Sequence, residues 1–149
     1  MRIDHTVAAR ILLTVATICL PGCSREPEQP AIVGAWYVNI PAAPYPYHLF
    51  IFHADGTVIQ SNPDSGNAHY SDSNLVGAWS SQKDRFKAKL IETSADRDSH
   101  RYVGRTELIL SIEVEGNSLR GTGTASSFQV GRPNGTPLPF DLSGSRIQP

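Results

Sequence analysis

Short runs of alternating polar and apolar residues, separated by turn residues about every ten positions, most constrain the fold of this chain from Ala31 onwards. In Arg85–Thr93, for example, Phe86, Ala88 and Leu90 alternate with basic residues. A period of two places the apolar side chains on one face of a β-strand and the polar ones on the other. Because no later stretch has the period of an amphipathic helix, the pattern predicts an all-β domain.

The alternating runs mark eight candidate strands, and the connections between them differ in length in a regular way. Asp55-Gly56 is typical of a two-residue hairpin turn. Tight and long connections alternate along the chain, so in an up-and-down antiparallel barrel all long loops lie at one end and both termini at the other. Eight strands enclose an interior that side chains fill or that holds one small ligand. The predicted strands are Gly34–Ile40, Tyr47–Ala54, Thr57–Ser61, Leu75–Gln82, Arg85–Thr93, Arg101–Glu115, Ser118–Phe128 and Leu138–Ile147.

The N-terminal segment has the features of an export signal. The apolar run Ile11–Leu20 follows two arginines and is too short to cross a bilayer as a helix. It ends in Leu20-Pro21-Gly22-Cys23, which resembles a bacterial lipobox and implies a lipid-modified Cys23 as the new N-terminus. Cys19 lies inside the apolar run, so Cys23 is the only cysteine that remains after cleavage. We therefore predict a signal peptide at residues 1–22, a tether at 23–31 and a barrel at 32–149.

Charge and localisation limit the expected partners. Removal of residues 1–22 takes away Arg2, Arg10 and Asp4 and changes the net charge from −1 to −2. Such a chain has no basic field that would attract nucleic acid. We expect an exported monomer in the cell envelope, attached through its lipid to the outer or the plasma membrane of a bacterium.

Residues in the first and the last predicted strand resemble those that characterise a known family. Gly34-Ala35-Trp36 resembles the G-x-W start of lipocalins, and Arg146 resembles the arginine that packs across that tryptophan at the closed end. The segments 52–57, 77–79 and 102–105 are similar to uncharacterised lipocalin-like exported proteins of bacteria. The resemblance implies a lipocalin-like (calycin-type) barrel in which Trp36 and Arg146 are structural. The T-D-Y-type motif of lipocalins and a C-terminal helix are absent from this sequence.

Aromatic and histidine side chains in the predicted barrel are the candidates for ligand binding. Tyrosines and histidines that combine an apolar body with a polar end gather near the expected mouth. Gly121, Gly123 and Ala125 share one strand face and leave room in the interior if that face points inward. The alternative is that Trp36 and its neighbours fill the interior. The predicted ligand-binding residues are Phe50, Phe52, Trp79, Phe86 and Tyr102 inside the barrel, with Tyr47, His48, His69 and Tyr70 at the rim.

The sequence contains no recognisable catalytic or metal-binding motif. The histidines lack metal-ligand spacing, and Glu113 and Glu115 lie on one outward strand face. We predict no catalytic residue, no metal site and no cofactor. The leading hypothesis is a lipoprotein that binds a small, largely apolar molecule or lipid. The alternatives are a cyclase or isomerase that resembles allene-oxide-cyclase-like barrels, and a structural or interaction module with a filled core.

Overall fold

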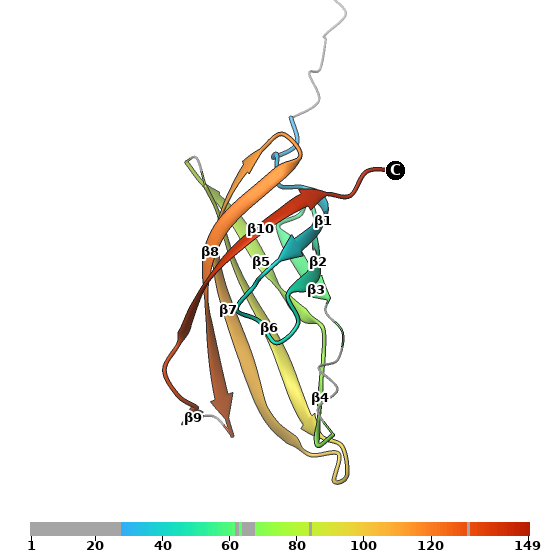
Figure 1. The fold of residues 1–149 in the computed structure, drawn as a ribbon, viewed down its shortest axis with the longest axis vertical. Coiled ribbons are helices and arrows are strands. Elements are labelled where there is room, and N and C mark those ends of the chain that lie inside the picture. The colour runs from blue at the N-terminus through green and yellow to red at the C-terminus, as the bar shows by residue number, and fades with distance from the viewer. Residues whose placement is uncertain (1–27, 62, 64–67, 84, 131) are drawn as a thin grey trace, which may run out of the picture.

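The computed structural model describes residues 28–149 except 62, 64–67, 84 and 131. In this part of the chain, eight long antiparallel strands form a closed barrel with sequential neighbours, which confirms the predicted fold (Figure 1). Closure occurs because the last strand, β10, pairs with both β8 and β1. The predicted signal peptide and Cys23 lie outside the described residues. The long strands are β1 (Gly34–Asn39), β2 (Tyr47–Phe52), β3 (Thr57–Ser61), β5 (Leu75–Gln82), β6 (Arg85–Asp96), β7 (Tyr102–Glu115), β8 (Ser118–Gln129) and β10 (Leu138–Arg146).

Two further strands were not predicted from the sequence. β4 (Tyr70–Asp72) pairs with β6, the strand that also pairs with β5, so β4 continues the line of β5 after a break at Ser73-Asn74. β9 (Arg132–Pro133) pairs with the far end of β8 in the same way. Both strands therefore extend the wall of the barrel without adding a new position to its circumference.

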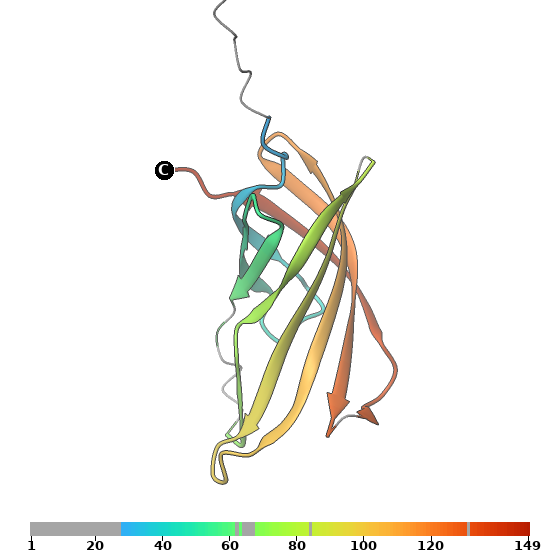
Figure 2. The ribbon, with the colours of Figure 1, turned by 180° about the vertical axis from the view of Figure 1, so that it is seen from behind.

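The barrel wall is much taller on one side than on the other. β6, β7 and β8 have 12, 14 and 12 residues, whereas β1, β2 and β3 have 6, 6 and 5. At about 3.3 Å per residue, the tall wall is roughly twice the height of the short one. β4, β9 and the β6–β7 connection lie at the end opposite the described chain ends (Figures 1 and 2). The mouth of the barrel is therefore slanted and is lowest beside β1–β3.

The closed end is organised around Trp36, which is fully buried. Its indole Nε1 donates a hydrogen bond of 2.8 Å to the Ile32 carbonyl. The guanidinium carbon of Arg146 lies 4.2 Å from the centroid of the Trp36 ring, so the predicted contact is present. Gly34 has a φ of 131°, and a Cβ at this position would lie 2.6 Å from Arg146 Nη1. The glycine of the G-x-W segment is therefore required by its backbone and by the arginine above it.

Above this closed end, the alternating residues of every wall meet in one apolar core. β2 shows the alternation most clearly, because His48, Phe50 and Phe52 are buried while the residues between them are exposed. Leu90 and Leu110 from the tall wall pack in the same cluster. The outer face of the tall wall carries ion pairs instead.

The described residues contain no helix that is long and apolar enough to cross a membrane.

Candidate functional site

A cavity of about 460 Å³ lies at the mouth of the barrel, between the short wall and the tall wall. This volume falls within the ~300–1,000 Å³ that is typical of small-molecule sites. The β1–β2 connection covers one side of the cavity, Pro63 in the β3–β4 connection contributes to the lining, and residues of the strands form the rest. The lining residues are Ile40, Ala42, Ala43, Pro44, Tyr45, His48, Gln60, Pro63, Asp72, Leu75, Glu92, Thr106, Leu108, Ala125, Ser127, Leu138, Pro139 and Phe140.

The floor of this mouth cavity is apolar and continues the core. Ile40 and Leu75 are buried, and Leu108 and Phe140 pack against the core cluster from the tall wall and β10. Of the three small residues of β8 that were expected to leave room for a ligand, Ala125 lines the cavity, but the expectation is wrong for Gly121 and Gly123. The Phe140 ring occupies the space beside Gly123, where a Cβ would lie 2.4 Å from Phe140 Cζ. The backbone of β7 leaves no more room at Gly121, where a Cβ would lie 2.3 Å from the Ser111 carbonyl oxygen.

The short wall contributes a buried polar pair, His48 on β2 and Gln60 on β3. Their side chains are 6% and 1% exposed, and Gln60 Nε2 lies 2.7 Å from His48 Nδ1. Because an amide nitrogen only donates, His48 Nδ1 accepts this hydrogen bond and Nε2 carries the proton. Burial lowers the pKa of His48, and the Tyr45 backbone carbonyl partly opposes this, so the ring is neutral near pH 7. In the described part of the chain, His48 Nε2 and Gln60 Oε1 have no hydrogen-bond partner.

The tall wall contributes two carboxyl groups to the same cavity, Glu92 on β6 and Asp72 on β4. Burial raises the pKa of Glu92; a hydrogen bond with the Thr106 side chain opposes this shift, and the nearby Asp72 adds to it. Glu92 pairs in register with Thr106, two residues closer to the mouth than the pair Leu90 and Leu108. A polar layer of the interior therefore lies directly above an apolar layer.

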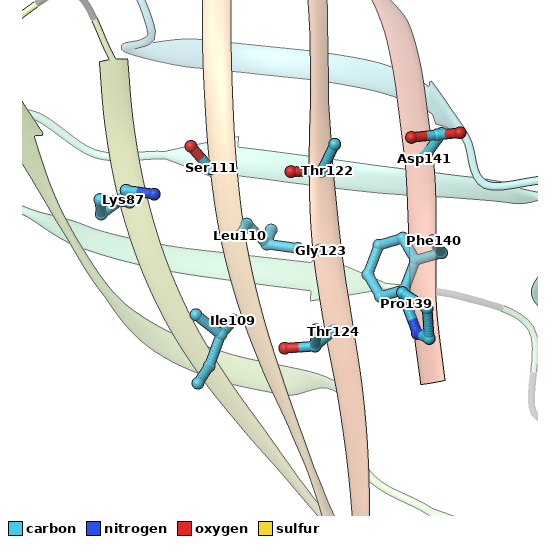
Figure 3. A pocket seen from close by; sticks show the side chains of 10 residues that line it. All are labelled: Lys87, Ile109, Leu110, Ser111, Thr122, Gly123, Thr124, Pro139, Phe140 and Asp141. Carbon is cyan, nitrogen blue, oxygen red and sulfur yellow. The ribbon is translucent and has the colours of Figure 1, made fainter. Parts of the chain in front are cut away.

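A second hollow, of about 510 Å³, lies on the outer side of the barrel. Figure 3 shows that its side chains come from four neighbouring strands, β6, β7, β8 and β10. Ile109 in this hollow is 52% exposed, and Thr122 and Asp141 are exposed as well. It is therefore a surface depression, and its lining contains none of the buried unpartnered polar atoms found in the described chain.

Of the nine residues predicted to bind a ligand, the structure places His48 in the lining of the mouth cavity. The others divide into two groups. Phe50 and Phe52 are 1% exposed in the core, and Trp79 and Phe86 pack against that core with their ring centroids 5.8 Å apart. These four aromatic side chains support the cavity from below.

The remaining predicted residues lie outside this lining. Tyr47 is 52% exposed and stacks on Tyr37 on the outer surface, with ring centroids 5.3 Å apart. Tyr102 is 51% exposed. His69 and Tyr70 meet edge to face at β4, with centroids 6.4 Å apart. For these residues, and for the four in the core, ligand contact stays a prediction.

Sequence reasoning missed three polar residues of the lining, Gln60, Asp72 and Glu92. Two of them carried a usable signal, because each is a polar residue that continues an apolar alternation. Gln60 follows Val58 at a spacing of two, and Glu92 follows Leu90 at the same spacing. A polar side chain in an inward position is costly to bury unless it has partners, so it indicates either a hydrogen-bond network or a ligand.

The described residues contain no group of three or more His, Cys, Asp and Glu side chains that could hold a metal ion. Comparisons with models of known protein families, with curated proteins and with solved structures found no match to this chain.

Proposed function

We propose that this protein is a lipid-anchored envelope lipoprotein that binds a small, largely apolar molecule in the mouth of its barrel. The observation that carries the proposal is the mouth cavity itself. It combines an apolar floor with a few convergent polar groups, the usual composition of a small-molecule site. A ligand in this position would contact Leu75, Leu108 and Phe140 with its apolar part and the polar layer with its head.

The finer assignment to a lipocalin-like carrier rests on the closed end. Gly34, Trp36 and Arg146 match the residues of the family resemblance, and their contacts give each a structural reason to be there. A carrier of this kind needs one sealed end and one open end. The packed Trp36–Arg146 end and the slanted mouth meet that need.

The position of the tether supports an orientation for the anchored protein. The described N-terminal residues and the C-terminus both lie at the closed end (Figure 1). A lipid on Cys23 would therefore hold the closed end towards the membrane, and the mouth would face away from it. This arrangement suits capture from the periplasm or the exterior better than extraction from the anchoring membrane.

A cyclase or isomerase of the barrel type is the second candidate function. His48 and Glu92 both have shifted pKa values and line one cavity, which is a common feature of catalytic sites. The two functions differ in what happens to the bound molecule. Nuclear magnetic resonance of a ligand before its addition to the purified protein and after its release would distinguish them. The compound would be unchanged for a carrier and rearranged for an isomerase.

The cavity itself is tested by titration with the neutral fluorescent probe N-phenyl-1-naphthylamine. Ala125→Trp places a large side chain in the cavity lining, and we expect it to weaken probe binding by about tenfold or more. Ser126→Trp is the matched control, because the next residue of β8 points to the other face. Circular dichroism of both variants establishes that they are folded. Probe binding that is absent from the wild type, or equal in all three proteins, would contradict the proposal.

A further inference from the structure

We propose that the ligand of the mouth cavity is a cationic amphiphile, an apolar molecule with a protonated amine that Glu92 and Asp72 hold. This inference rests on the proposed binding function and names the chemical class of the ligand. Four groups of the polar layer carry it, two carboxyl groups from the tall wall and two buried side chains from the short wall.

The first observation is that both carboxyl groups face one cavity without a cation. The ion pairs between described residues use Glu107 and Glu113 on the outer surface, with lysine and arginine partners. Among the described residues, neither Glu92 nor Asp72 forms an ion pair. Burial raises the pKa of Glu92, and the nearby Asp72 adds to this shift. A bound ammonium group would favour the ionised form of Glu92.

The second observation is independent and comes from the short wall. Gln60 is 1% exposed, and its Oε1 atom has no donor within the described chain. Buried acceptors in native proteins nearly always have a partner. An ammonium group has three N–H donors, so it has enough to reach Gln60 Oε1 as well as a carboxylate.

His48 is the other buried polar side chain that the short wall contributes to the cavity. It is 6% exposed, and its protonated Nε2 also lacks a partner in the described residues. An N–H donor is satisfied by a hydroxyl or carbonyl oxygen and not by an ammonium group. His48 Nε2 can therefore meet an oxygen atom of the ligand and not its amine.

The spacing of the strands allows one head group to meet both walls. Gln60 on β3 pairs in register with Leu75 on β5, and β5 pairs with β6, which carries Glu92. Adjacent strands are about 4.8 Å apart, so the backbones of β3 and β6 are roughly 10 Å apart across β5. Gln60, Leu75 and Glu92 therefore lie on neighbouring strands and line the same cavity.

The charge of the cavity excludes the opposite class of amphiphile. A fatty-acid anion would place a third carboxylate beside Glu92 and Asp72 in a partly desolvated space, where like charges repel strongly. None of the described residues that line the cavity is a lysine or an arginine.

The experiment compares three probes of equal chain length, dodecylamine, dodecanol and dodecanoate, in displacing N-phenyl-1-naphthylamine from the full protein at pH 7. We expect dodecylamine to bind about tenfold more tightly than dodecanol, and dodecanoate to bind most weakly. Glu92→Gln should remove most of this preference for the amine and leave dodecanol binding within about twofold. Glu113→Gln is the matched control, since it removes one negative charge from the outer surface instead.

The outcomes separate this inference from the proposed function. If dodecanol binds as tightly as dodecylamine, the inference is overturned while the apolar binding function stands. If none of the three probes displaces the dye, the binding function itself fails. Asp72→Asn provides a second variant on a different strand in case Glu92→Gln does not fold. A preference for the amine that survives both substitutions would overturn the assignment of the carboxyl groups.

Discussion

Arg146 links the last strand of the barrel to the residues that precede the first, and its replacement by methionine should destabilise the protein strongly. Its Nη1 atom donates a hydrogen bond of 2.6 Å to the Val33 carbonyl, and Nη2 donates to the Ala31 carbonyl. The guanidinium also stacks on Trp36. Methionine keeps most of the apolar stem, so Arg146→Met removes chiefly the charge and the planar group.

The expected loss follows from these contacts. A stacked guanidinium contributes about 0.5–2 kcal/mol, and a hydrogen bond from a charged donor about 1.5–3 kcal/mol when it is shielded from water. The bond to Ala31 is exposed and adds little. We therefore expect Arg146→Met to lower the free energy of unfolding by about 2–5 kcal/mol. For a domain of this size, that corresponds to a fall in Tm of roughly 8–20 °C.

Thermal unfolding followed by circular dichroism measures this loss, and two further variants test its origin. Arg146→Lys keeps the charge without the planar fork and should recover less than half of the stability. Gly34→Ala should be destabilising in the wild type, because its φ is 131° and Arg146 lies above it, and less so when Arg146 is methionine. The reasoning is refuted if Arg146→Met leaves Tm unchanged, or if lysine restores it fully.

Three further predictions concern the cavity and the anchor. Because the pKa of Glu92 is raised in the folded state, its ionisation destabilises the fold as pH rises. Glu92→Gln should therefore raise the urea midpoint of unfolding above that of the wild type at pH 7, but not at a pH below the ordinary glutamate pKa. Equal midpoints for variant and wild type at pH 7 would contradict this. Gln60→Leu should lower the free energy of unfolding by about 1–3 kcal/mol, because it leaves His48 Nδ1 unpaired. The double variant His48→Phe/Gln60→Leu should recover this loss, which chemical denaturation of both variants measures. Cys23→Ala should abolish labelling of cells with a palmitate analogue, and an unlabelled wild type would rule out the lipid anchor.

Strand positions and the closed end were predictable from the sequence because they depend on local patterns. The predicted strands Thr57–Ser61 and Leu75–Gln82 have the bounds of β3 and β5. The alternation of tight and long connections also correctly placed the start of the described chain and the C-terminus at the closed end. β4 and β9 were missed, because strands of two or three mostly polar residues have no alternation that could reveal them.

The candidate site was predicted only in part. Both Tyr47 and His48 were predicted at the rim, but alternation along β2 turns His48 inward and its neighbour Tyr47 outward. Alternation does not show how deep an inward residue lies. Phe50 and Phe52 share the inward face with His48, but they lie deeper and fill the core.

The sequence by itself determined an all-β barrel with a closed end at Trp36 and Arg146, since both follow from periodicity and from a short motif. Only the tertiary structure decided where that barrel is hollow. The unequal heights of the two walls, and the register of strands that are distant in sequence, bring Gln60, Asp72 and Glu92 around one cavity. Register across a closed barrel is set by all of its strands together, so no local pattern contains it.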